Sequence, residues 1–314
     1  RLHQGAFYAL PQSPQLLKQT LMVSGIERYY QLARCLRDED LRGDRQFEHT
    51  QIDMELSFVQ RDDVLTTVEG LIQSIMCVIG VEVQTPFPRL GFQEAIDRFG
   101  SDKPDTRFGM AFVDLSAVFA QTAFQAFSAV LGAGGQVKGI NAKGAAGFSR
   151  RELDELTAFV QEFGAKGLAY FQVTAEGVKS PIAKFLSAQE QASLRTAMQA
   201  EEGDLLLLLA DTPAVVATAL GRLRLHLGDR LGLIPAGQWN YLWVVDFPLC
   251  AWNEETQQIE PMHHPFTMPK AADLDKLDTD PLSVRGDLYD LVLNGNELCS
   301  GSIRIHRRDI QERV

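Results

Sequence analysis

The residues from Glu48 to Phe58 alternate between polar and apolar side chains, and this constrains the fold more than any other stretch of the chain. Successive side chains of a β-strand point to opposite faces, so Asp53 and Glu55 share one face while Ile52 and Leu56 share the other. One interpretation is an antiparallel sheet with one solvated face, which is a common arrangement. The other is a sheet whose polar face forms the carboxylate-lined floor of an active site.

The segment before this strand favours the active site. A second strand-like run, Arg28 to Leu36, is joined to it by a charged loop that contains Arg37, Arg42 and Arg45. Guanidinium groups bind phosphate with two parallel hydrogen bonds, so arginines gathered at a hairpin tip indicate a phosphate-rich ligand.

Two helices are predicted around this hairpin. Ser13 and Pro14 are typical of a helix start, with Ser as the N-cap and Pro in the first turn, and Gly25 is expected to end that helix. Apolar residues at helical spacing predict a second helix over 62–79.

The middle of the chain, about 115–235, has the pattern of a separate α/β module. Ser149 with Glu152, and Ser187 with Glu190, match the capping box that opens a helix. Apolar runs predict strands in this module and after it, at 168–173, 205–209, 239–247, 289–293 and 302–306.

Length and composition bound the class of protein. The chain has 314 residues, enough for two domains, and its apolar stretches are too short to span a membrane. A net charge of −11 argues against a nucleic-acid coat, although a local basic patch remains compatible with RNA binding. The four cysteines form no CxxC pair, which favours the reducing cytoplasm. Because the chain starts at Arg1 and its last residues resemble an interrupted helix, we expect a piece of a longer protein, and whether that protein has a targeting segment stays open.

Several short motifs, taken in order, resemble one family. Residues 37–39, the arginine-rich loop and residues 50–53 look like motif 2 of the class II aminoacyl-tRNA synthetases. Residues 7–18, with the sequence Gln-Ser-Pro-Gln inside, resemble the amino-acid-binding segment of the bacterial-type aspartyl enzymes. Further motifs of the same family follow in order at 101–105, 243–248, 263–267 and 302–306.

The resemblance implies an α+β fold, in which a mixed, mainly antiparallel class II sheet has flanking helices and an inserted α/β domain. It divides the chain into a first catalytic part at 1–114, an insertion at 115–235 and a second catalytic part at 236–314. The family's N-terminal anticodon-binding domain, motif 1 and motif 3 have no counterpart in these residues. We therefore expect the full-length protein to be a homodimeric enzyme and the 314 residues alone not to be competent.

The implied reaction is aspartate–tRNA ligation: ATP activates L-aspartate as aspartyl-adenylate, and the aspartyl group then moves to the tRNA 3′ end. Because a carboxylate is already the nucleophile, catalysis would consist of positioning and charge stabilisation, with Arg37 as the catalytic residue. Residues expected to bind ATP are Arg37, Asp38, Glu39, Gln46, His49 and Glu297. Residues expected to bind aspartate are Ser13, Gln15, Lys18, Asp53, His263 and Arg304. Residues expected to bind Mg²⁺ are Asp290 and Glu297.

Two departures from the family pattern affect the predicted site. Phe47 and His49 stand where the family usually has Pro and Phe, and that Phe stacks on adenine. A His ring offers less apolar area, so weaker ATP binding is expected. The glycine-rich run after Glu297 is replaced by Cys299 and Ser300, which adds side chains where the backbone would approach a ligand.

Other interpretations stay open at the level of sequence. The protein could be a non-catalytic tRNA-binding or regulatory relative, and the tRNA charged could be tRNA(Asp) alone or also tRNA(Asn). Asparagine and lysine synthetases fit less well, because the Gln-Ser-Pro-Gln segment and the large insertion are aspartate-like. Lys18 and Arg304 could be surface residues, and His263 with His264 could be a metal pair. Asp290 and Glu297 could belong to a polar hairpin.

Overall fold

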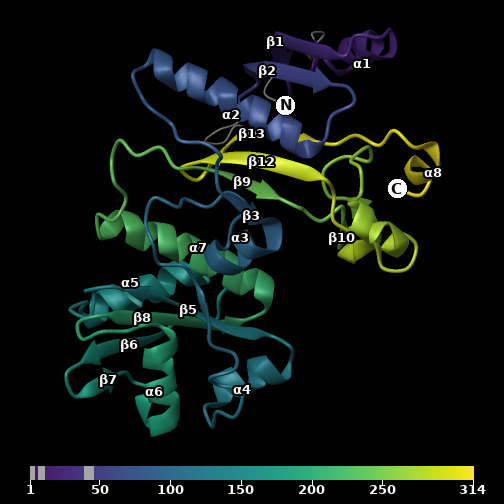
Figure 1. Cartoon of the computed structure of the whole chain (residues 1–314). Coiled ribbons are helices and arrows are strands. Elements are labelled where there is room, and N and C mark those ends of the chain that lie inside the picture. The colour runs from purple at the N-terminus through teal and green to yellow at the C-terminus, as the bar shows by residue number, and fades with distance from the viewer. Residues whose placement is uncertain (1–3, 6–10, 39–45) are drawn as a thin grey trace. The chain divides into compact units, whose positions relative to one another are not determined.

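The computed structural model describes residues 4–5, 11–38 and 46–314 (Figure 1). The chain divides into two compact units, Arg1–Pro86 and Phe87–Val314, and each is described by itself. Both contain helices and antiparallel strands, which confirms the predicted α+β class.

The first unit is an antiparallel hairpin with two helices. Its elements are α1 (Gln15–Val23), β1 (Arg28–Leu36), β2 (Glu48–Leu56) and α2 (Arg61–Val78). The hairpin is in register over its whole length, so the strand at 28–36 is confirmed and the strand predicted at 48–58 ends at Leu56. The helix predicted at 62–79 is confirmed, shifted by one residue at each end.

The start of α1 differs from the predicted cap. Pro14, not Ser13, is the N-cap, and it makes no side-chain capping bond because proline has no polar side chain. The Ser13 hydroxyl accepts a long hydrogen bond of 3.4 Å from the Gln15 amide. Gly25 follows the helix with φ of +100°, a left-handed conformation that suits glycine, so the predicted stop is confirmed.

The second unit contains a four-stranded sheet in the order β13-β12-β9-β3 (Figure 1). Neighbouring strands are antiparallel except β3 and β9, which are parallel. Helix α3 packs on this sheet through Ala95, against a core that includes Val244 and Val292. The elements are β3 (Arg89–Gly91), α3 (Phe92–Phe99), β9 (Tyr241–Val245), β12 (Leu288–Leu293) and β13 (Asn296–Ser302).

An antiparallel five-stranded sheet, in the order β4-β5-β8-β6-β7, lies between β3 and β9 in the sequence. The strand β8 is buried on both faces: Leu207 packs with α5 and α7, and Leu206 packs with α4 and α6 (Figure 1). This two-sided burial explains why β8 is a continuous run of leucines rather than an alternating pattern. The elements are β4 (Val113–Asp114), α4 (Gln125–Gly132), β5 (Gln136–Ala142), α5 (Arg150–Gln161), β6 (Ala169–Thr174), β7 (Gly177–Lys179), η1 (Ala183–Phe185), α6 (Ala188–Ala197), β8 (Leu205–Asp211) and α7 (Pro213–Arg230).

The capping boxes predicted at Ser149 and Ser187 are both present, each with its glutamate bonded back to the cap. This sheet and its helices span Val113–Arg230. The three-part division at 114/115 and 235/236 stays a prediction.

The last part of the chain corrects one predicted strand. The strand expected at 302–306 is absent, because β13 already ends at Ser302. The following residues pair one at a time with the loop at 266–268: the Met268 amide bonds to the Ile303 carbonyl, and Arg304 forms an isolated bridge with Thr267. The remaining elements are β10 (Cys250–Asn253), β11 (Gln258–Pro261), η2 (Ala271–Lys276), η3 (Pro281–Ser283) and α8 (Arg308–Gln311). Within the described ranges, none of the helices has the length and apolar character of a membrane span.

Candidate functional site

The polar face of the hairpin is covered rather than solvated. Helix α1 places the Lys18 ammonium 2.8 Å from Asp53 Oδ1 and 3.2 Å from Glu55 Oε2, and the three side chains are 6%, 10% and 16% exposed. The apolar face is instead open, with Leu32 67% and Ile52 45% exposed. The solvated polar face is therefore wrong, because α1 brings a cation over the carboxylates and makes their burial tolerable.

The side of α1 that carries Lys18 also carries a second predicted ligand. Gln15 and Lys18 are three residues apart on a helix, so their side chains leave the same face. Asp53 Oδ2 is buried and accepts no hydrogen bond within the described part of the chain, whereas Oδ1 accepts from Lys18 and, at 3.4 Å, from Gln51. A buried carboxylate oxygen with spare capacity suits an ammonium donor.

Four of the predicted ATP ligands, Arg37, Asp38, Gln46 and His49, lie at the end of the same hairpin near Leu36 and Glu48, whereas Glu297 belongs to the second unit. Arg37 follows β1, its amide donates to the Phe47 carbonyl at 2.8 Å, and its Nε donates to the Gln12 carbonyl at 3.4 Å. His49 pairs with the buried Cys35 across the strands. Asp38 and Gln46 are exposed beside this tip. Glu39, also predicted, lies outside the described residues.

The predicted Mg²⁺ ligands, Asp290 and Glu297, lie on the β12–β13 hairpin. This hairpin is not simply a solvated polar turn. Asp290 is buried, and its Oδ1 has no hydrogen-bond partner among the described residues. Burial, reinforced by the nearby charges of Glu297 and Asp102, raises the pKa of Asp290 to about 7. Such a perturbed acid in a cluster of like charges is typical of a functional site. Lys103 reaches this cluster, with its Nζ 3.6 Å from Glu297 Oε2.

Cys299 lies in the same hairpin, across from Leu291. Burial raises the pKa of this thiol to about 12, so it is neither a nucleophile nor a thiolate ligand at neutral pH.

The two adjacent histidines have different partners. His263 packs edge-on against Phe247 with ring centres 5.3 Å apart, and burial lowers its pKa although Asp102 and Glu297 oppose that shift. His264 stacks on Phe266 at 3.9 Å, and burial together with Arg304 lowers its pKa to about 4.

Arg304 is held by this second histidine. Its Nη1 lies 2.6 Å from His264 Nε2, and its guanidinium lies over the Phe266 ring at 4.7 Å. A neutral imidazole whose Nε2 accepts from a guanidinium does not present that nitrogen to a cation, which argues against the metal pair. Arg304 is thus a stacked, partly buried arginine and not a solvated one.

The structure brings the predicted residues together in two groups. Ser13, Gln15, Lys18, Asp53, Arg37 and His49 belong to the first unit, and His263, Asp290, Glu297 and Arg304 belong to the second. The sequence interpretation gave no role in binding ATP or aspartate to His264, Asp102 or Lys103. The motifs at 101–105 and 263–267 were the signal for them, but only long-range contacts show which of their residues face the carboxylates.

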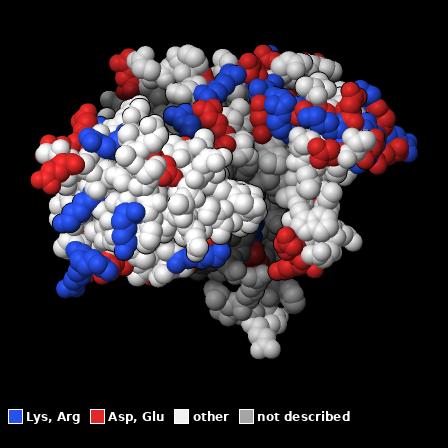
Figure 2. Space-filling model, turned by 90° about the horizontal axis from the view of Figure 1, so that it is seen from below, with Lys and Arg blue, Asp and Glu red and all other residues white. Residues whose placement is uncertain are grey.

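Surface charge gives a weaker indication. Figure 2 shows one face of the molecule, on which lysines and arginines lie in several separate places near the edges, mixed with aspartates and glutamates, and largely uncharged atoms fill the middle. Among the described residues on this face, basic side chains do not form the broad stripe that non-specific nucleic-acid binding requires.

Comparison with known proteins agrees with the motifs. The family described as tRNA synthetases class II (D, K and N) matches residues 1–314. The aspartate–tRNA(Asp/Asn) ligase of Moorella thermoacetica is 56% identical over 315 residues, which are 100% of this chain and 52% of that protein. That of Anoxybacillus flavithermus is 54% identical over 100% of this chain and 53% of the relative. The aspartate–tRNA ligase of Halalkalibacterium halodurans is 54% identical with the same coverage.

The chain spans about half the length of these curated relatives. A solved aspartyl tRNA synthetase from Entamoeba histolytica aligns over 99% of this chain and 42% of its own, at 14% identity and a TM-score of 0.41, which is too loose a match to support an argument. The whole-length family match and the relatives above 50% identity show that the chain belongs to the class II tRNA synthetases of the D, K and N type.

Proposed function

We propose that this chain is the amino-acid-activating part of an aspartate–tRNA ligase. An oxygen of the aspartate α-carboxylate attacks the α-phosphorus of ATP, the bond to the β-phosphate breaks, and aspartyl-adenylate and pyrophosphate form. The tRNA 3′ hydroxyl then takes the aspartyl group and AMP leaves. The names of the relatives support this assignment.

The observation that carries the proposal is the buried group of Lys18, Asp53 and Glu55. Free aspartate has one ammonium and two carboxylates, so its site needs both an anion and cations that are shielded from water. Asp53, with Gln15, would accept the ammonium group, and Lys18, with Arg304, would bind the side-chain carboxylate. Ser13 and His263 are the other two residues proposed to contact aspartate.

Activation requires no general base, because the attacking carboxylate is already ionised at neutral pH. Arg37 would stabilise the charge that develops on the α-phosphate, while Asp38, Glu39 and Gln46 would fix the nucleotide. The His49 ring would lie against the adenine. Positioning and electrostatics would then supply most of the acceleration.

Asp290 and Glu297 fit a magnesium site. Both are hard oxygen ligands, and the Asp290 Oδ1 atom is buried without a partner in the described part of the chain. A bound Mg²⁺ would neutralise charge on the ATP phosphates. It would also relieve the like-charge repulsion that contributes to the raised pKa of Asp290.

The partners of the full-length protein follow from the same assignment. We propose that it acts as a homodimer in the cytoplasm on tRNA(Asp), or on both tRNA(Asp) and tRNA(Asn), since relatives carry both kinds of name. The thiols of all four cysteines are free, which suits a reducing compartment.

The test is aspartate-dependent ATP–pyrophosphate exchange by the full-length protein. Arg37→Ala is expected to lower exchange by about 10²-fold or more, the effect of losing one well-placed donor to a transition state. Arg34→Ala is the matched control, because Arg34 lies on β1 three residues before Arg37, with its side chain 75% exposed and in an ion pair with Glu48. A folded wild-type dimer that catalyses no exchange would support the non-catalytic tRNA-binding alternative instead.

A further inference from the structure

The loop from Gly100 to Gly109 packs against one face of α7. That face is formed by Ala217, Gly221, Arg224 and Gly228, which recur at the spacing of one helix stripe. A Cβ on Gly228 would lie 2.7 Å from the Phe108 ring, and one on Gly221 would lie 3.1 Å from the Gly100 carbonyl oxygen. Glycine in a helix interior costs about 0.5–1 kcal/mol, so this close approach is maintained against a local penalty.

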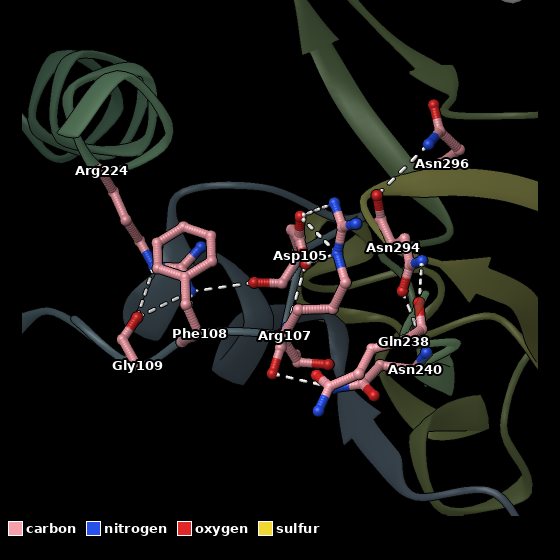
Figure 3. Close-up of polar contacts among 10 residues, drawn as sticks. Asp105, Arg107, Phe108, Gly109, Arg224, Gln238, Asn240, Asn294 and Asn296 are labelled. Carbon is pink, nitrogen blue, oxygen red and sulfur yellow. Dashed lines mark hydrogen bonds and ion pairs between the residues drawn. The ribbon is translucent and has the colours of Figure 1, made fainter. Parts of the chain in front are cut away.

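Arg224 joins the helix to the loop (Figure 3). It is 1% exposed, and its guanidinium donates to the carbonyl oxygens of Asp105 at 2.9 Å, Phe108 at 2.8 Å and Gly109 at 2.8 Å. The group also stacks on the Phe108 ring at 4.0 Å. Burial lowers the pKa of Arg224 to about 10, and it remains a cation at neutral pH.

In the described part of the chain no carboxylate lies within hydrogen-bonding distance of this guanidinium, and every acceptor is a loop carbonyl. Burying a charge is costly, and an apolar side chain would close the helix–loop contact with less penalty. What an apolar residue cannot do is fix three carbonyls at once. The arginine therefore specifies the path of the loop.

The other side of the loop contacts the β12–β13 turn (Figure 3). Asn240 Nδ2 donates to the Thr106 carbonyl at 3.1 Å, and the Asn240 amide donates to Asn294 Oδ1 at 2.9 Å. A Cβ on Gly295 would lie 3.3 Å from Asp105 Cβ. The loop from Gly100 to Gly109 is thus held between α7 and the turn that joins β12 to β13.

The same loop delivers charges to the carboxylates. Lys103 lies 3.6 Å from Glu297, and the charge of Asp102 acts on both Asp290 and His263. Any shift of the carbonyls at 105–109 would move this neighbouring segment relative to Asp290 and Glu297.

We propose that Arg224, on the inserted domain, is a positioning residue for the ATP–Mg²⁺ site, acting by fixing the loop that presents Asp102 and Lys103 to Asp290 and Glu297. The inference rests on the proposed function. It makes the insertion part of the support for the triphosphate rather than an independent appendage. The aspartate pocket around Lys18 and Asp53 has no part in it.

The test compares Arg224→Met and Arg224→Lys with wild-type full-length protein in aspartate-dependent ATP–pyrophosphate exchange. The Mg²⁺ midpoint of exchange, the KM for ATP and the Mg²⁺–ATP concentration that gives half of the ligand-induced rise in melting temperature are each expected to increase about tenfold in Arg224→Met, as for loss of an outer support of metal ligands. The KM for aspartate should stay unchanged. Arg224→Lys keeps the charge but not the three-carbonyl fork, and an intermediate shift is expected. Arg222→Met is the control, because Arg222 is an exposed arginine of the same helix whose ring contact is with Phe163 at 5.8 Å.

Asn240→Ala removes the hydrogen bond to the Thr106 carbonyl and so loosens the loop on the side away from α7. This variant provides a second test if Arg224→Met does not fold. It should shift the Mg²⁺ midpoint in the same direction. Unchanged Mg²⁺ and ATP dependence in a folded Arg224→Met protein, or an equal rise in the KM values for ATP and aspartate, would overturn the inference alone. A wild-type protein without any exchange would overturn the proposed function and the inference with it.

Discussion

Replacing Lys18 by methionine tests the buried group of Lys18, Asp53 and Glu55, at which the proposal places aspartate. The substitution keeps the length and the apolar stem of the side chain but removes the ammonium that lies 2.8 Å from Asp53 and 3.2 Å from Glu55. Asp53 Oδ1 would keep only the long contact with Gln51 at 3.4 Å, while Oδ2 has no partner among the described residues to begin with. The variant thus leaves a buried carboxylate nearly without donors.

Breaking a buried ion pair on one side costs about 3–5 kcal/mol. Since each 1.4 kcal/mol is a factor of ten, amides of the β1–β2 hairpin should exchange with solvent roughly 10²–10³-fold faster. Hydrogen-exchange mass spectrometry on peptides covering 28–36 and 48–56 measures this directly. Arg34→Met is the control, because its exposed pair with Glu48 should contribute no more than about 1 kcal/mol.

The double variant Lys18→Met with Asp53→Leu separates stability from function. Replacing both members of the Lys18–Asp53 pair by apolar groups is often close to neutral, but Glu55 still loses its cation, so hairpin protection should return only in part. Aspartate-dependent ATP–pyrophosphate exchange should be lost in both the single and the double variant, because the double variant restores neither the cation nor the ammonium acceptor. Unchanged protection in the single variant would refute the burial argument, and recovered activity in the double variant would refute the pocket assignment.

Three further predictions concern other parts of the chain. The pKa of Asp290 is raised to about 7, so the folded state holds a proton that the unfolded state releases, and this group makes stability fall as pH rises from about 4 to 7. Asp290→Asn should therefore unfold at a higher temperature than wild type at pH 8 and at a similar temperature at pH 4.5; equal melting temperatures at both pH values would contradict this. His49→Phe should lower the KM for ATP about three- to tenfold, the value of about 0.5–1.5 kcal/mol for an aromatic stack, in exchange assays at saturating aspartate; an unchanged or higher KM would count against adenine stacking. Ser149→Ala removes the N-cap of α5 and should lower the free energy of unfolding in denaturant by about 1 kcal/mol, with no effect on ATP–pyrophosphate exchange. A loss of that activity would show that the start of α5 matters to the proposed ATP site.

Local signals in the sequence predicted much of the fold. The two-residue alternation placed β2, and the Ser-Glu spacing placed the starts of α5 and α6, because these features depend on neighbours within a few residues. The strand expected at 302–306 failed for the opposite reason. Its alternation is real, but its backbone partners are single residues of the loop at 266–268, and no local pattern encodes that pairing.

The sequence could not predict which charged side chains are buried. Alternation divided β2 into two faces, but the choice of the covered face depended on Lys18 arriving from α1. Arg224 is similar: an arginine within a helix is usually solvated, and only the loop carbonyls around it show that this one is buried. The ligand roles of all the predicted site residues stay predictions.

The most direct test of aspartate activation by this protein is the amino-acid specificity of adenylate formation. ATP–pyrophosphate exchange should be measured for the full-length protein with aspartate, asparagine and lysine, in wild type and in Arg304→Ala. Exchange is expected with aspartate only, and it should be lost in Arg304→Ala, because a partly buried guanidinium stacked on Phe266 and bonded to His264 is set to bind a carboxylate. Exchange that is equally fast with asparagine, or that survives Arg304→Ala undiminished, would contradict it.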